Sequence, residues 1–131
     1  MPLHATGRFE NKSFDENEVE QLDGGAKVTS AHIVQSTSGD LDGELTADLV
    51  MYYAADGTAT YLGFQRFTGT IDGRSGGLVM RASGGYDGKE ARVDAVVVDG
   101  WGEFADVRGQ GYSSAGHGST GKFEFDFTEG I

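Results

Sequence analysis

Apolar and polar residues alternate along positions 45–98, in runs that Asp-Gly pairs interrupt. These pairs are Asp56-Gly57, Asp72-Gly73 and Asp87-Gly88. Asp-Gly between alternating runs indicates a tight β-hairpin, because a type I′ turn needs positive φ at both central positions. The pattern therefore predicts four consecutive antiparallel strands, at 45–54, about 58–71, 74–86 and 89–98.

Alternation continues toward both ends of the chain. Further strands are expected at 4–14, 28–38, near 109–113 and at 122–128, with an acidic loop at 15–25 that holds a short helical turn. No stretch of about eleven or more residues keeps the period of an amphipathic helix. The spacing predicts one all-β domain over residues 1–131, an eight-stranded antiparallel up-and-down β-barrel of lipocalin-like architecture.

The length of each turn decides which side chains share a face of the sheet. Two-residue turns place Asp48 opposite Gln65, Tyr52 opposite Tyr61, and Gln65 opposite Met80. The face that holds these residues is mainly apolar, small and aromatic, so it is the expected lumen. Small residues there are expected to leave room for a cavity: Gly63, Ala82 and Gly84. A slip of one residue would exchange the faces and bring inside Leu49, Met51, Leu62 and Phe64.

The opposite face holds most charges, including an expected cross-strand pair of Arg81 and Asp94. An apolar group on this outer face predicts a subunit interface: Leu49, Met51, Leu62, Phe64 and Val79. We therefore expect a homo-oligomer, most simply a two-fold homodimer.

Composition narrows the classes of partner. A net charge of -11 and a pI near 4.4 argue against nucleic acid and anionic membrane surfaces. Cysteine is absent and the histidines are scattered, so no metal or cofactor is expected. No apolar run approaches the ~20 residues of a membrane span. The first residues lack the pattern of a signal peptide, which makes the cytoplasm the expected location.

Polar groups in the predicted lumen supply candidate chemistry. Asp48 could act as a general base with a pKa raised by burial, while Gln65 orients a carbonyl. A satisfied internal hydrogen bond is the alternative for this pair. Candidate ligand contacts are Tyr52, Tyr61, Phe67, Met80, Tyr86, Glu10 and Trp101. Trp101 would cover one barrel mouth. Whether Glu10 points into the lumen or outward is not determined. His32 points inward only if the turn at 39–43 has three residues, and outward if it has two.

Glycine-rich motifs recur in order along nearly the whole chain. They are Ala5-Thr6-Gly7-Arg8-Phe9-Glu10, Ser38-Gly39-Asp40-Leu41-Asp42-Gly43, Phe67-Thr68-Gly69-Thr70, Gly73-Arg74-Ser75-Gly76 and Arg108-Gly109-Gln110-Gly111. Together they resemble the uncharacterised bacterial family called domain of unknown function 3224. The resemblance implies an allene oxide cyclase-like barrel, often oligomeric, whose lumen can hold an apolar substrate. Family members often have Glu in place of Gln65 and His in place of Ala82, so their possible acid–base pair is not expected here.

These observations lead to one expected function and two alternatives. The chain is expected to bind a small apolar or aromatic metabolite in the lumen, as a cofactor-free cyclase or isomerase that shapes its substrate. One alternative is a non-catalytic carrier or sensor of a similar ligand, and the other is a scaffold with a packed lumen. The sequence does not decide whether the protein is an enzyme.

Overall fold

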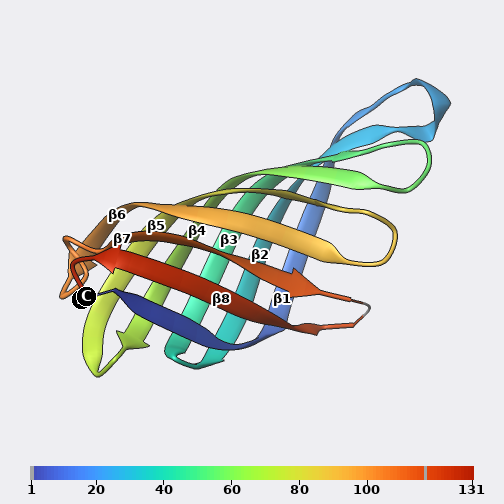
Figure 1. Ribbon diagram of the computed structural model, residues 1–131. Coiled ribbons are helices and arrows are strands. Elements are labelled where there is room, and N and C mark those ends of the chain that lie inside the picture. The colour runs from blue at the N-terminus through green and yellow to red at the C-terminus, as the bar shows by residue number, and fades with distance from the viewer. Residues whose placement is uncertain (1, 117) are drawn as a thin grey trace.

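The computed structural model describes residues 2–116 and 118–131, and nearly all of them lie in β-strands (Figure 1). The strands are β1 (Leu3–Gln21), β2 (Lys27–Gly39), β3 (Leu41–Tyr53), β4 (Ala59–Ile71), β5 (Arg74–Tyr86), β6 (Ala91–Gly102), β7 (Arg108–Ala115) and β8 (Thr120–Glu129). A short 3₁₀ turn, η1 (Asp23–Gly25), follows β1. Each strand pairs antiparallel with the next, and β8 pairs with β1, which closes the sheet into a barrel. The predicted all-β fold of eight antiparallel strands is therefore confirmed. None of the helical turns in the described ranges could cross a membrane.

The β4–β5 loop is the two-residue turn that its sequence predicts. Ile71 pairs with Arg74, so Asp72 and Gly73 are the central residues. Their φ angles of 52° and 76° are both positive, as a type I′ turn requires. This turn fixes Tyr61, Gln65 and Met80 on the inner face, as predicted.

The β3–β4 loop is one residue longer than predicted. The amide of Ala54 donates to the carbonyl of Thr58, which leaves Ala55, Asp56 and Gly57 in the loop. Gly57 has a φ of 91°, the positive value that a three-residue hairpin with a glycine bulge needs. Asp56 supports this shape, because its Oδ1 accepts hydrogen bonds from the Thr58 amide and hydroxyl.

The extra residue reverses the predicted faces of β3. Asp48 lies opposite Phe64 and Tyr52 opposite Thr60, so both point outward, and the predicted pairs with Gln65 and Tyr61 are wrong. Leu49 and Met51 are instead buried in the lumen, which corrects their predicted place in a subunit interface. The reversal follows from the two-residue period of a strand, in which a shift of one position moves every side chain to the other face.

The β5–β6 loop shifts the register by two residues, which preserves the faces. Asp87 and Glu90 flank the central residues of the turn. Ala95 and Val97 are therefore buried, as predicted. The shift places Asp94 opposite Ser83 instead of Arg81, so the predicted cross-strand pair of Arg81 and Asp94 is wrong.

Strand β1 continues where the sequence predicted an acidic loop at 15–25. A bulge between Asn11 and Ser13 places Phe14 on the same inner side as Phe9. Beyond Glu10, β1 pairs with β2 but no longer with β8. The part of the β1–β2 hairpin nearest its loop therefore projects beyond the ring. It lies at the same end of the barrel as the β3–β4 and β5–β6 loops (Figure 1).

The buried side chains form two separate clusters. The first cluster fills the end of the barrel that the segment between β6 and β7 covers, and we call this end the closed half. Phe104 and Val107 of that segment are fully buried there, beside the phenylalanines of β8. The rings of Phe125 and Phe127 stack there with centroids 5.7 Å apart. The second cluster, the open half, lies toward the β1–β2 and β3–β4 loops and includes Ala47, Leu49, Met51 and Tyr61. Aromatic residues thus seal one end and leave the other accessible.

Candidate functional site

A cavity of about 180 Å³ occupies the open half of the lumen. It is lined by Phe9, Asn11, Phe14, Ile33, Gln35, Ala47, Leu49, Met51, Tyr53, Tyr61, Gln65, Ala91, Val93, Ser113, Ser114 and Ala115. No residue of the closed-half cluster is among them. A cavity of about 150 Å³ with apolar walls can hold benzene, so this one is sized for a ligand of one ring.

The polar groups of the cavity wall are mainly amides and hydroxyls. Gln65 is 3% exposed and its side chain lines the cavity. Gln35 donates from Nε2 to Asn11 Oδ1 at 2.8 Å, which orients the pair, while its buried Oε1 has no partner. A buried polar group without a partner costs about 1–3 kcal/mol. The wall therefore offers polar groups, Gln35 Oε1 among them, to which a polar group of a ligand could hydrogen-bond.

Glu16 lies at the rim of the cavity, held by two hydroxyls. Tyr53, which lines the cavity, donates its hydroxyl to Glu16 Oε2 at 2.7 Å, and Thr29 donates to the same oxygen at 2.6 Å. Burial, then the hydrogen bond to Glu16, raises the pKa of Tyr53. Burial and the nearby Glu16 charge also raise the pKa of Tyr61. Both phenols therefore remain protonated hydrogen-bond donors at neutral pH.

Two of the predicted site residues, Gln65 and Tyr61, do line the cavity. Tyr86 packs against the same cluster and donates its hydroxyl to the carbonyl of Gly88 at 2.9 Å. Phe67 and Met80 face the lumen but are fully buried in the closed half, away from the cavity. These positions follow from the register of β4 and β5, which was predicted correctly because the Asp72-Gly73 turn has the expected two residues.

Asp48 lies outside the barrel, so the proposed lumenal pair with Gln65 is wrong. Its carboxylate contacts His32 Nδ1 at 2.6 Å and Arg66 Nη2 at 2.7 Å, and the side chain is 49% exposed. The hydrogen bond to His32, then the one to Arg66, lowers the pKa of Asp48, opposite to the rise that burial would cause. His32 points outward with Asp48. A partly exposed carboxylate with a low pKa is a poor general base.

Three further candidates also lie on the outer surface. Tyr52 is exposed, and Glu10 accepts a hydrogen bond from Lys12 at 3.1 Å. Trp101 does not cover a barrel mouth: its indole lies against the backbone of Gly77, where an added Cβ would be 1.9 Å from the ring. Phe104 and Val107 fill the end of the barrel instead, because they are the apolar residues that the β6–β7 segment turns inward.

The small residues expected to create the cavity have another role. A Cβ on Gly63 would lie 2.0 Å from the carbonyl oxygen of Asp48, and one on Gly84 would lie 1.9 Å from that of Arg92. These glycines permit close approach of neighbouring strands, and Ala82 packs in the wall. The cavity is lined by residues of β1, β2, β3, β4, β6 and β7, and none of the described lining residues belongs to β5.

The sequence did not point to Glu16 at the rim or to several residues that line the cavity. Glu16 falls in the predicted loop, Gln35 was never assigned a face, and the serines lie in β7, whose hydrophobic alternation is weak. Gln35 could have been found, because it lies two residues after the apolar Ile33 in the 28–38 run and so shares its face of the strand. The inner position of Ala47 was hidden by the length of the β3–β4 loop.

The family model for proteins of unknown function DUF3224 matches residues 5–127. The chain belongs to the DUF3224 family. A crystal structure of a DUF3224 protein of unknown function from Shewanella oneidensis has a similar fold, with a TM-score of 0.77 and 23% sequence identity over 98% of this chain and 97% of that chain. No curated protein matches the chain. The comparisons therefore place this chain in a family and support its fold.

Two positions at which this DUF3224 chain was expected to differ from its relatives both face the lumen. Gln65 pairs with Met80 and Ala82 pairs with Gly63, so the two are diagonal neighbours on the inner face of β4 and β5. Gln65 lines the cavity, whereas Ala82 does not. This wall therefore presents an amide to the cavity.

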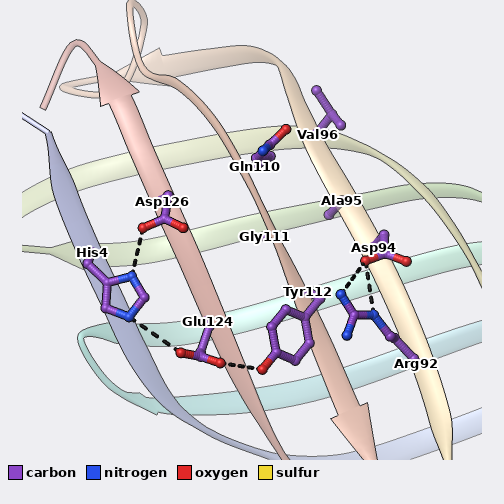
Figure 2. Close-up of a pocket in the computed structure, with 10 residues that line it drawn as sticks. All are labelled: His4, Arg92, Asp94, Ala95, Val96, Gln110, Gly111, Tyr112, Glu124 and Asp126. Carbon is purple, nitrogen blue, oxygen red and sulfur yellow. Dashed lines mark hydrogen bonds and ion pairs between the residues drawn. The ribbon is translucent and has the colours of Figure 1, made fainter.

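A second hollow of about 430 Å³ lies on the outer face of the DUF3224 barrel, over β1, β6, β7 and β8 (Figure 2). His4 bridges Asp126 at 2.7 Å and Glu124 at 3.4 Å, and Tyr112 donates its hydroxyl to Glu124. These carboxylates, Asp126 foremost, raise the pKa of His4, whereas the Tyr112 hydroxyl lowers that of Glu124. The described residues contain no group of three or more side chains arranged to hold a metal.

The other side of this hollow is also internally paired. The guanidinium of Arg92 donates to Asp94 at 2.9 and 3.1 Å and lies 4.0 Å from the centre of the Tyr112 ring. The network connects four neighbouring strands on the outside of the ring (Figure 2). Because its charged groups bind each other, we assign it to the closure of the sheet and take the lumenal cavity as the candidate site.

Proposed function

We propose that this DUF3224 protein binds a small ligand of one ring in the open half of its lumen. The observation that supports this proposal is the cavity itself, an apolar chamber with uncharged amides and hydroxyls in its wall. Such a combination is typical of small-molecule sites, in which apolar contacts give affinity and a few polar groups give orientation. Gln65 and Gln35 are the polar groups that orient the ligand.

The chemistry of the wall favours a carrier or sensor over a cyclase or isomerase. The described residues that line the cavity include no aspartate, glutamate, histidine, lysine or arginine. Proton transfer needs a group with a suitable pKa within hydrogen-bond reach of the reacting atoms, and Asp48 is on the other side of the wall. The carboxylate of Glu16 lies at the rim, outside the wall that would surround the ring of a ligand, and two hydroxyls already donate to it. We also propose that the protein is related to the allene oxide cyclase-like barrels, which the ring of eight strands around a cavity supports. A cytoplasmic location is a further part of the proposal.

Benzyl alcohol is a suitable probe, because it has one ring and one group that can hydrogen-bond to an amide. We expect saturable binding by isothermal titration calorimetry, and an affinity at least about tenfold lower in Ala47→Leu, whose larger side chain enters the cavity. Leu49→Phe fills the same space from the next inward position. Ala55→Leu adds the same atoms in an exposed turn and is the matched control.

Circular dichroism establishes that each variant is folded before binding is compared. No binding to the wild-type protein would overturn the proposal. Undiminished binding to both folded cavity-filling variants would overturn it as well, because the probe would then lie outside the lumen.

We also propose that a second copy of the chain covers the outer face of β3 and β4. Val50, Leu62 and Phe64 are all more than half exposed there, and Val50 lies directly opposite Leu62. This group replaces the predicted interface, from which Leu49 and Met51 have moved inside, while Val79 remains at its partly buried margin. Exposed apolar groups of this kind mark interaction surfaces.

The charges beside this outer patch suit a two-fold pair. One cross-strand row runs from Asp15 on β1, through β2, β3 and Phe64 on β4, to Arg81 on β5. Asp15 and Arg81 are four strand spacings apart, roughly 19 Å. Neither forms an ion pair within the described residues. A two-fold axis near β3 would bring the Arg81 of each copy to the Asp15 of the other.

A further inference from the structure

Glu16 is a carboxylate fixed at the cavity rim with one oxygen unused. Both hydrogen bonds from Thr29 and Tyr53 reach Oε2, and within the described residues no donor reaches Oε1. Glu16 forms no ion pair among those residues either. Two hydroxyl donors thus hold the carboxylate in one orientation and leave an oxygen available to another donor.

The position of Glu16 on β1 directs it inward. It lies opposite Ala31, which is buried in the open-half cluster, and directly opposite residues in an antiparallel pair share a face. The Tyr53 ring lines the cavity, so its hydroxyl connects the cavity wall directly to the carboxylate. A ligand that filled the cavity would meet this charged group at its outer end.

Aromatic rings surround the same rim. Tyr53 and Tyr61 line the cavity, and Phe14 lines it while remaining 48% exposed. The Lys27 ammonium lies 5.2 Å from the centre of the Tyr53 ring, so a ligand ammonium at Glu16 would contact the rings of Tyr61 and Phe14. Aromatic faces attract ammonium groups through the ring quadrupole, and a carboxylate adds a charge-assisted hydrogen bond.

We propose that Glu16 and the surrounding aromatic rings recognise the ammonium group of a small amine whose ring enters the lumen. This inference rests on the lumenal binding site proposed above and specifies its ligand as an arylalkylamine. The ring occupies the apolar chamber, and the ammonium donates to Oε1 of Glu16. The net charge of -11 favours the approach of such a cation.

Benzylamine and benzyl alcohol form a matched pair of probes, because they share a ring and differ in the charge of the polar group at pH 7. We expect calorimetry to give a roughly tenfold higher affinity for benzylamine, since a charge-assisted contact and a cation–π contact together supply about that factor. The preference should decrease as salt is raised from about 0.05 to 0.5 M, because the rim is partly exposed to solvent.

Glu16→Gln should abolish the preference and leave the affinity for benzyl alcohol within about twofold. Glu20→Gln is the matched control, because it removes the same charge from the same strand at a position opposite the outward-facing Val28. Tyr53→Phe removes one of the two hydroxyls that orient Glu16, so it should reduce the preference.

The outcomes separate this inference from the lumenal binding site itself. Equal binding of the two probes overturns amine recognition and leaves lumenal binding intact. A benzylamine preference that persists in Glu16→Gln also overturns it, because the ammonium would then contact another group. If neither probe binds the wild-type protein, both proposals fail.

Discussion

Asp48 belongs to a surface network in which His32 and Arg66 hold its two carboxylate oxygens. All three side chains are 40–49% exposed, so water screens their attraction. Exposed ion pairs contribute about 0.2–1 kcal/mol, and this network should not exceed that range by much. The network joins β2, β3 and β4 on the side of the sheet away from the cavity.

We therefore expect Asp48→Asn to lower the free energy of unfolding by about 0.2–1 kcal/mol at pH 7 without changing lumenal binding. The pKa of Asp48 is lowered in the folded state, so its contribution is present above the unfolded value near 3.8 and is lost as pH falls through the folded value. Urea unfolding should show the difference from wild type at pH 7, and the difference should shrink as the pH falls below about 3.8. A fall of threefold or more in benzyl alcohol affinity would contradict this assignment.

Three hairpins that share the dipeptide Asp-Gly form three different loops. Asp72 and Gly73 are both central in a two-residue turn, Asp56 and Gly57 end a three-residue loop, and Asp87 precedes the central residues of its turn. The dipeptide supplies a residue that tolerates positive φ but does not determine which residues pair on either side. Local hydrogen bonds, such as those of Thr58 to Asp56, decide the length.

The same difference explains how much of the site could be predicted from the sequence. Strand order, strand number and the inward direction of Gln65 and Tyr61 followed from alternation and from one turn of correct length. Asp48 and Tyr52 were placed on the wrong side because one extra loop residue reverses a whole strand. Glu16 was missed because polar residues dominate the upper part of β1, whose outer edge is not paired with β8.

At the β3–β4 loop, Gly57→Ala should lower the free energy of unfolding by about 1 kcal/mol. Its φ of 91° disfavours any side chain, while nothing lies within 4 Å of an added Cβ, so the cost is conformational alone. Thermal unfolding should show a decrease of about 2–6 °C in Tm.

Gly116→Ala is the control for this substitution. Its position also has open space for a Cβ, and its φ is not in the positive region. It should therefore be neutral or slightly stabilising. Equal losses for the two variants would show that backbone strain at Gly57 is not the cause.

The barrel has two outer surfaces of different character. On β6, β7, β8 and β1 the charged groups pair with each other within one copy, as Figure 2 shows. On β3 and β4, apolar side chains are exposed, and Asp15 and Arg81, at the ends of the row that crosses them, form no ion pair with any other described residue. The second surface is therefore the one on which we propose that a second copy binds.

Sedimentation equilibrium should show a dimer that Phe64→Asp converts to a folded monomer, because the half-exposed ring is not needed in the core. Val98→Asp, an equally radical change on the outer face of β6, should leave the dimer intact. Arg81→Asp should weaken association, and Asp15→Arg in the same chain should restore it. A monomeric wild-type protein, or failure of the double exchange to restore a weakened dimer, would contradict this arrangement.

The separation between the closed and open halves has a consequence for how such barrels can change over evolutionary time. The phenylalanines that seal one end share no residue with the cavity wall at the other. Substitutions around the cavity can therefore change its shape and its polar groups while the packing of the sealed end is kept, so under the proposed function the ligand could change without loss of the fold.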